Sequence, residues 1–211
     1  WTPAVDGEQY SEGAGVLVVP GTFTVSMQQR VDGVLTDLNQ TQSFEVVSIR
    51  EPTLPGNTQE QRVVFESQVD ELGRAADGTA NAIERYSAEL DAIKLVLTRS
   101  LADQSLFEIA DSIQERLHEQ SDRISQNATR EFFQDTIAMS LQERFWHARF
   151  NPTSSAYGPT PPQRTSYDIG RRLYDDIVKQ LDILIDDEYE GLKQALDQAG
   201  VPWTPGRGVQ Q

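Results

Sequence analysis

Cysteine is missing from this 211-residue sequence, and histidine occurs only twice. Without cysteine the chain has no disulfide bond, no thiolate metal site and no cysteine nucleophile. Neither His118 nor His147 has a second histidine at the spacing of a metal site. The lack of cysteine and the small number of histidines therefore exclude thiolate and paired-histidine metal sites and a cysteine nucleophile.

Positive charge and long apolar runs are also scarce. The chain has 18 lysines and arginines against 33 aspartates and glutamates, which gives a formal charge of −15. A surface this acidic repels phosphate, so we expect no nucleic-acid partner and no attraction to an anionic membrane. No run approaches the roughly 18 apolar residues that cross a bilayer, so we also expect no membrane insertion.

No group of side chains in the sequence predicts catalysis, a bound cofactor or a metal. The acidic runs Asp175-Asp176 and Asp186-Asp187-Glu188 fall on a predicted helix, where adjacent positions point about 100° apart and do not converge on one ion. The G-x-S-x-G turn of a hydrolase and a glycine-rich phosphate loop are both missing. We therefore predict that this chain is not an enzyme.

The composition changes near Pro52, and this change divides the chain. Gly, Val, Thr and Phe dominate before it, whereas Glu, Gln, Ala, Leu and Arg dominate after it. We expect a small antiparallel β segment over residues 1–50, a linker over 51–57, a helical bundle over 58–200 and a tail over 201–211. The predicted fold class is α+β, predominantly α: a small antiparallel sheet followed by an antiparallel bundle of three or four long helices.

β-Strand periodicity marks the first fifty residues. Apolar and polar side chains alternate over residues 22–29 and again over 42–49, as they do in half-buried strands. Asp32-Gly33 is typical of a tight hairpin turn, because glycine accepts a positive φ. With a short apolar run at 15–19, these segments predict about three strands, too few to be stable alone. The sheet should either pack on the helices or leave an open edge.

A heptad pattern begins after the linker. Its positions alternate spacings of four and three: Phe65, Val69, Leu72, Ala76, Thr79, Ile83, Tyr86, Leu90, Ile93 and Leu97. This pattern predicts one long helix over about 58–99, whose apolar seam packs in a bundle or coiled coil. Shorter patterns predict helical segments over about 106–124 and 129–149.

The last part of the chain combines a proline-rich stretch with a final helix. Residues 151–164 contain four prolines and are expected to form a loop or strap rather than a helix. Ser166 is the predicted N-cap of the last helix, and Gly200 is its predicted stop. The apolar seam of this helix runs through either Leu184 or Ile185.

Four aromatic residues are the candidates for an interaction site. Trp203 lies between two prolines in the tail, where it either folds back onto the protein or docks on a partner. Trp146, Phe150 and Tyr157 flank the proline-rich stretch, and exposed aromatic rings of this kind can stack on sugars. The alternative is a structural role, in which the aromatic residues beside this stretch pack under it and hold it in place.

Several sequence stretches resemble one family. PGTFTVSM (20–27), RVDGVLTDL (30–38) and QSFEVV (42–47) resemble the closing hairpin of the β-sandwich segment that follows the propeller in bacterial BNR-repeat, sortilin-like "glycosyl hydrolase" proteins. RTSY (164–167) and AGVPWTPGR (199–207) are similar to the start and end of the last helical segment in that family. The helices between match in pattern more than in letters.

This resemblance implies a function and a location. Any glycoside chemistry of the family is expected in the propeller, which has no counterpart here, so no catalytic residue is carried over. We therefore predict a non-catalytic C-terminal accessory module of a larger secreted or cell-envelope (periplasmic) protein, bracing the propeller or mediating protein–protein association. The alternative is a carbohydrate- or peptide-binding module that uses the aromatic residues near the proline-rich stretch.

The expected partner is the rest of the parent protein or another protein, and association into homo-oligomers through helical faces is a further expectation. Because the chain opens at Trp1 rather than methionine, we expect a processed, excised or engineered piece.

Overall fold

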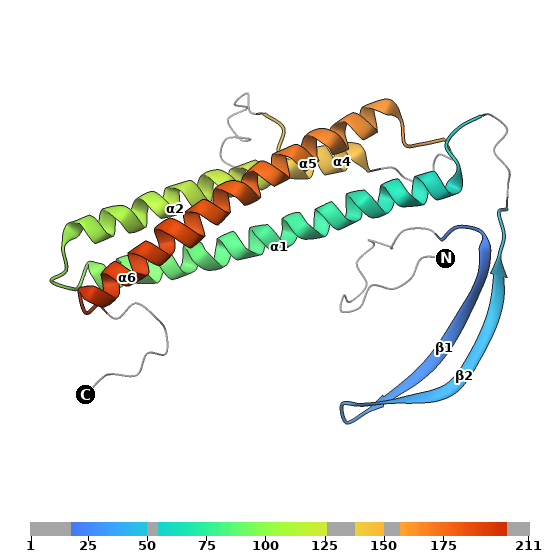
Figure 1. Ribbon diagram of the computed structural model, residues 1–211, viewed down its shortest axis with the longest axis horizontal. Helices are drawn as coiled ribbons and strands as arrows, with labels where there is room; N and C mark the ends of the chain where they lie inside the picture. The colour runs from blue at the N-terminus through green and yellow to red at the C-terminus, as the bar shows by residue number, and fades with distance from the viewer. Residues whose placement is uncertain (1–17, 50–54, 126–137, 150–156, 202–211) are drawn as a thin grey trace. The chain divides into compact units, whose positions relative to one another are not determined.

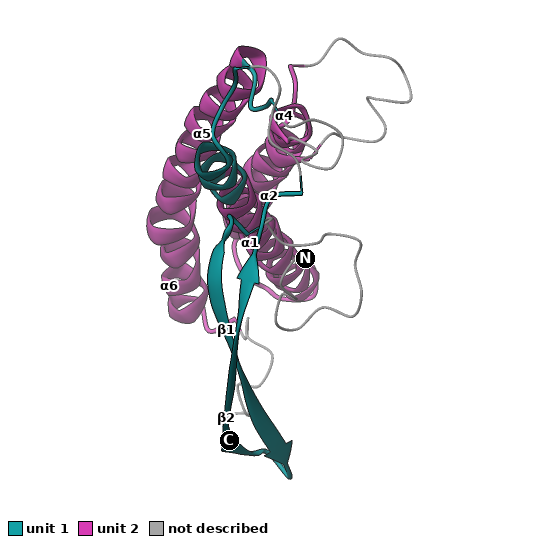
Figure 2. Ribbon diagram, turned by 90° about the vertical axis from the view of Figure 1, so that its right-hand side faces the viewer, with its two compact units in different colours: residues 1–68, 150–160 teal, residues 69–149, 161–211 magenta. Residues whose placement is uncertain are grey.

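The computed structural model describes four stretches of the chain: residues 18–49, 55–125, 138–149 and 157–201 (Figure 1). They belong to two compact units, shown in different colours in Figure 2. Unit 1 comprises 1–68 and 150–160, and unit 2 comprises 69–149 and 161–211. The described chain is mostly helical with one small antiparallel sheet, which confirms the predicted α+β, predominantly α class.

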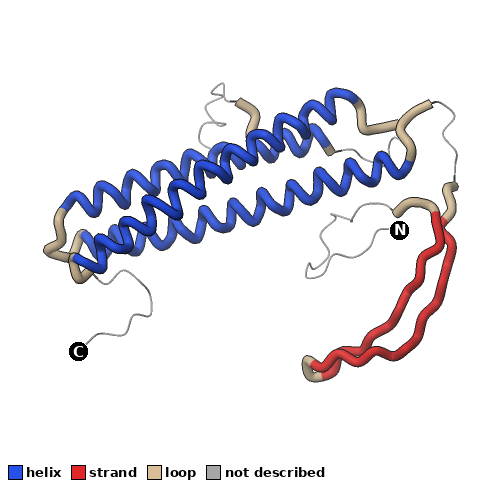
Figure 3. The backbone as a smooth tube through the Cα atoms, viewed as in Figure 1, coloured by secondary structure: helices blue, strands red, loops and turns tan. Residues whose placement is uncertain are grey.

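The sheet, in unit 1, is a hairpin of two long strands, β1 (Gly21–Val31) and β2 (Val34–Val46) (Figure 3). The predicted turn is confirmed, because the strands pair directly on either side of Asp32-Gly33. These two residues have φ values of 50° and 81°. Positive φ at both central positions defines a type I′ turn, whose twist matches that of the flanking strands.

In the described part of the chain the sheet has two strands rather than the expected three or so. Residues 34–38 join residues 42–46 in one continuous β2, and residues 47–49 lie beyond its end. Of the short apolar run at 15–19, Val18 and Val19 belong to no strand, and the remainder lies outside the described residues.

A bulge makes this long β2 compatible with the shorter β1. Leu38 and Asn39 face no residue of β1, and the ladder resumes at the pair Gln28–Asp37. Asn39 has a φ of 51°, and its N–H donates to the Asp37 side chain at 2.8 Å. Asparagine tolerates this left-handed conformation better than most residues, so the two extra residues leave the ladder at little cost.

The heptad pattern forms one helix, α1 (Gln59–Leu97), as predicted. Every seam position is buried except Thr79 and Tyr86, which are half-buried. Gly73 and Gly78 do not interrupt the helix.

Unit 2 is an antiparallel bundle (Figure 1). Its described residues form most of α1 and five further helical segments: α2 (Gln104–Ile124), α4 (Leu141–Ala148), α5 (Pro161–Asp182), the π-helical η1 (Ile183–Tyr189) and α6 (Glu190–Gln198). α5, η1 and α6 follow one another without a break, as one long rod. A single apolar core includes side chains from all of these elements.

The last helix begins earlier than predicted. α5 starts at Pro161, so the proline-rich loop does not extend to residue 164, and Ser166 is not the N-cap. Prolines are tolerated in the first turn, where backbone N–H groups have no acceptor within the helix. Ser166 is instead buried inside α5, and its hydroxyl donates to the carbonyl of Arg144 at 2.9 Å. The predicted stop is confirmed, since Gly200 has a φ of 68°.

The helical segment predicted over 129–149 is shorter in its described part. Residues 138–140 are not helical, and α4 begins only at Leu141. Ser140 is its N-cap and forms a capping box with Glu143. This box ends the helix on its N-terminal side, because it satisfies N–H groups that have no helical acceptor. Residues 126–137 lie outside the described part.

η1 resolves the open choice between Leu184 and Ile185. Leu184 is buried and Ile185 only half-buried. The next buried position is Tyr189, five residues on, followed by Leu192. Five residues overshoot one α-helical turn, whereas the wider π turn brings Tyr189 back to the core face.

Candidate functional site

Two of the four predicted aromatic site residues are described by the structure. Trp146 lies on α4 and is 74% exposed, with its ring edge-on to that of His147 at 5.1 Å. The preceding Phe145 is buried, so the helix turns one aromatic ring into the core and the next toward solvent. Phe150 and Trp203 lie outside the described residues.

Tyr157 belongs to unit 1, where residues near the start of α1 hold it. Its carbonyl accepts a hydrogen bond from the Asn57 side chain at 3.2 Å, and the same amide donates to the Pro159 carbonyl at 3.1 Å. The Tyr157 ring packs so closely on Gly56 that a Cβ there would lie 3.1 Å from it. Trp146 belongs to unit 2, so these two aromatic residues lie in different units.

Acidic side chains of the last helical rod pair with arginines. Asp175 accepts from Arg171 one turn earlier at 3.1 Å, and Asp176 forms an ion pair with Arg123 of α2. Within the described stretches, no three histidine or acidic side chains form a group that can hold a metal ion. Arg171, near the start of the rod, is thus engaged in a local ion pair with Asp175.

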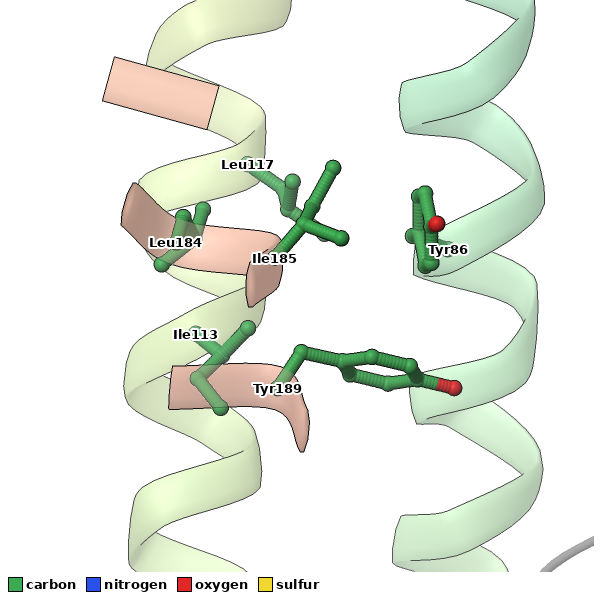
Figure 4. Close-up of a pocket in the computed structure, with 6 residues that line it drawn as sticks. All are labelled: Tyr86, Ile113, Leu117, Leu184, Ile185 and Tyr189. Carbon is green, nitrogen blue, oxygen red and sulfur yellow. The ribbon is translucent and has the colours of Figure 1, made fainter. Parts of the chain in front are cut away.

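A small apolar hollow lies in the core, shown in Figure 4. Its lining comes from α1, α2 and η1: Tyr86, Ile113, Leu117, Leu184, Ile185 and Tyr189. The hollow is too narrow for a water molecule. It is therefore a packing imperfection beside the π-helical turn and has no room for a ligand.

Tyr189 is the most perturbed ionisable group of this region. Its ring meets that of Tyr86 edge-on at 5.2 Å, and its hydroxyl donates to the carboxylate of Glu89. Burial raises the pKa of the Tyr189 phenol above its ordinary value, and the hydrogen bond to Glu89 and the charge of that carboxylate raise it further. The phenol thus stays neutral and acts as a structural link between α1 and η1.

The hairpin carries the most extensive group of exposed apolar residues. The register places five of them, Val25, Met27, Val31, Val34 and Phe44, on one face together with the half-buried Phe23. These six residues are here called the apolar hairpin face. Val25, Met27 and Val34 are 54%, 59% and 66% exposed. Phe23 and Phe44 are cross-strand partners with stacked rings, 6.0 Å between centroids.

The opposite face of the hairpin is polar apart from the exposed Leu35, the cross-strand partner of Arg30. Thr24 and Ser43 are cross-strand partners, and their hydroxyl groups are hydrogen-bonded at 3.1 Å. The alternation that separated apolar from polar residues in the sequence therefore produces an amphipathic two-stranded sheet. Neither outer edge pairs with a further strand in the part of the chain that the structure describes.

The sequence signalled part of this surface. Phe23, Val25 and Met27 were predicted to share a face, and the structure places them together. The contributions of Val31 and Val34 were missed, although they flank Asp32-Gly33. The type I′ turn identified from that dipeptide fixes these valines as cross-strand partners, so the signal was available.

The fold and the surface together define an amphipathic β-hairpin in one unit and a helical bundle in the other. No protein-family model matches the sequence, and no match was found among curated proteins or solved structures. None of the helices in the described stretches combines the length and apolar character that a membrane crossing requires.

Proposed function

We propose that this chain is a non-catalytic association module that docks onto a larger protein through the apolar hairpin face. The observation that carries the proposal is that face itself, six apolar side chains on one side of a two-stranded sheet. A two-stranded hairpin is marginally stable in water, and covering apolar side chains contributes about 1.5–3 kcal/mol for each one fully buried. Docking therefore stabilises both the hairpin and the complex.

The helical seam is a weaker basis for association. Leu72, Leu90 and Ile93 of the heptad pattern are buried within the chain's own core, so they are not free to bind a partner. Other exposed apolar residues of the helices, such as Leu95 and Ile109, are spread over different elements. This distribution favours the hairpin over the helical faces as the docking surface.

The partner we propose is the remainder of a parent protein. The stretches from PGTFTVSM to QSFEVV, which resemble the closing hairpin of a β-sandwich after a propeller, form the two strands and their turn. On this proposal the parent is a secreted or cell-envelope protein, and the chain is its accessory module.

The test mixes the full chain with the polypeptide encoded upstream of Trp1 and measures the mass of the complex by light scattering. Met27→Lys places a charge on the apolar hairpin face and should weaken the complex at least tenfold, which is about 1.4 kcal/mol. Gln28→Lys adds the same charge at the next residue, on the polar face, and should leave binding nearly unchanged.

Equal loss of binding in the two variants would contradict docking through this face. An upstream sequence that encodes no β-rich segment would contradict the proposed parent.

A second candidate function rests on Trp146. Its 74% exposure leaves a large aromatic surface open to a sugar or peptide. Titration of soluble oligosaccharides by calorimetry tests this function, with Trp146→Ala compared against Leu101→Ala, which removes a different exposed apolar side chain. Binding that Trp146→Ala abolishes and Leu101→Ala preserves would support it, and an absence of heat for every oligosaccharide would end it.

A further inference from the structure

The two outer edges of the hairpin are chemically different. β1 runs for 11 residues without a bulge or a proline, and Arg30 is its only charged residue. β2 is interrupted by the bulge at Leu38 and Asn39 and carries two carboxylates, Asp37 and Glu45. Bulges and charges are the means by which proteins block edge pairing, so β2 is a protected edge and β1 is not.

We propose that the outer edge of β1 pairs antiparallel with β1 of a second copy of this chain. Full overlap of the two strands places a twofold axis at Ser26 and produces a four-stranded sheet. The apolar hairpin faces of both copies then lie on the same side of this sheet, since a twofold axis perpendicular to a sheet preserves its faces. This inference does not depend on the proposed function, because it uses backbone groups of the edge and leaves the apolar side chains free to dock.

The sequence of β1 is compatible with itself in this register. On the polar face Ser26 lies opposite its own copy, Thr24 lies opposite Gln28, and Thr22 lies opposite Arg30. On the apolar face Val25 lies opposite Met27. No two like charges oppose each other, which would destabilise the pairing.

Electrostatic repulsion between the two Arg30 side chains is also limited in this arrangement. The two Arg30 residues lie eight positions apart along the ladder, roughly 27 Å at the usual strand rise. The open ends, at Gly21 of each copy, are ten positions apart, about 34 Å by the same rise. The separation of the two Arg30 residues exceeds the Debye length of about 8 Å at physiological ionic strength, so repulsion between these two side chains is largely screened.

Pairing along β1 stabilises the sheet because it increases the number of strands. A two-stranded hairpin is marginal in water, whereas three or more strands with a common apolar face can be stable. Pairing along β1 doubles the strand count and satisfies backbone N–H and C=O groups that point away from β2. It also produces one broad apolar face from two narrow ones.

The first test uses the absence of cysteine from the chain. Ser26→Cys puts a single thiol at the proposed twofold axis, where a short bis-maleimide reagent should link two copies. Thr41→Cys is the matched control, because Thr41 is the cross-strand partner of Ser26 and lies on the same face but on the other strand. We expect cross-linked dimer from Ser26→Cys and little from Thr41→Cys.

The second test blocks one edge at a time. Residues that flank a two-residue turn form a hydrogen-bonded pair, so the next pair, Arg30 and Leu35, is not hydrogen-bonded and its N–H groups point outward. Arg30→Pro removes an outward donor from β1, and Leu35→Pro removes its counterpart from β2, while both spare the hairpin's own ladder. In sedimentation equilibrium of the full chain, Arg30→Pro should weaken the dimer at least tenfold and Leu35→Pro should not.

Three results would overturn the proposal. A chain that stays monomeric at every accessible concentration has no such pairing. Equal cross-linking of the two cysteine variants places the contact elsewhere than at the β1 edge. A dimer that Leu35→Pro weakens as much as Arg30→Pro does not depend on β1.

Discussion

Tyr189 shows how a single residue depends on its place in the fold. Its ring is buried, and its hydroxyl donates to Glu89 on a different helix. The sequence prediction did not include it. Of the two alternatives left open there, Leu184 is the buried one, and an α-helical seam through Leu184 does not reach a position five residues later. The π-helical turn of η1 restores that position to the core.

The raised pKa of Tyr189 predicts a loss of stability in alkali. A phenol whose pKa is higher in the folded state than its ordinary value of about 10 stabilises the fold below that pH, and this contribution is lost as the pH rises above it. The free energy of unfolding should therefore fall more steeply above pH 10 for the natural chain than for Tyr189→Phe. Denaturant titrations of both proteins from pH 8 to pH 12 measure the difference, and parallel profiles would contradict the prediction.

At the scale of the element, helix starts were the least well predicted feature. The signal for α4 was present, because Ser140 and Glu143 have the S-x-x-E spacing of a capping box. The start of α5 was missed for another reason. Prolines normally indicate a break, but Pro161 and Pro162 occupy the first turn, where they are compatible with a helix.

The capping box predicts a measurable effect on stability. The backbone N–H of Glu143 donates to the Ser140 hydroxyl at 3.3 Å, and the Glu143 carboxylate accepts from the Ser140 N–H at 2.8 Å. Ser140→Ala removes the first bond and should lower the free energy of unfolding by about 1 kcal/mol. Ser140→Thr keeps a hydroxyl cap and should recover most of the loss. Chemical denaturation followed by circular dichroism measures both, and an unchanged midpoint in Ser140→Ala would show that the cap is not needed.

At the scale of the whole molecule, the two units are stabilised differently. Among the described residues, the buried members of the bundle's core come from the helical segments and Val201. The hairpin contributes no residue to that core cluster. A substitution in one unit should therefore have little effect on the other.

This separation predicts independent unfolding. Leu90 is fully buried, and Leu90→Ala should lower the stability of the bundle by about 2–5 kcal/mol, through lost burial and the cavity that remains. Val25→Thr, on the exposed hairpin, should change the helical transition by less than about 0.5 kcal/mol. Thermal melts followed by helical circular dichroism compare the two, and a comparable shift from Val25→Thr would show that hairpin and bundle unfold as one.

The sequence by itself determined the features that depend on local periodicity and on turn chemistry. The alternation from Phe23 to Met27, the positive-φ turn at Asp32-Gly33, the seam of α1 and the stop at Gly200 follow from spacing and backbone preference. Neighbouring residues alone are enough to specify each of them.

Only the tertiary structure decided which residues meet across the chain. It joined residues 34–46 into one strand around a bulge, placed Tyr189 against Glu89, and buried Ser166 against the Arg144 carbonyl. It also assigned the heptad seam to the chain's own core while leaving the apolar hairpin face exposed. The physical reason is that burial and pairing depend on partners distant in sequence, and a periodic pattern identifies a face without identifying what covers it.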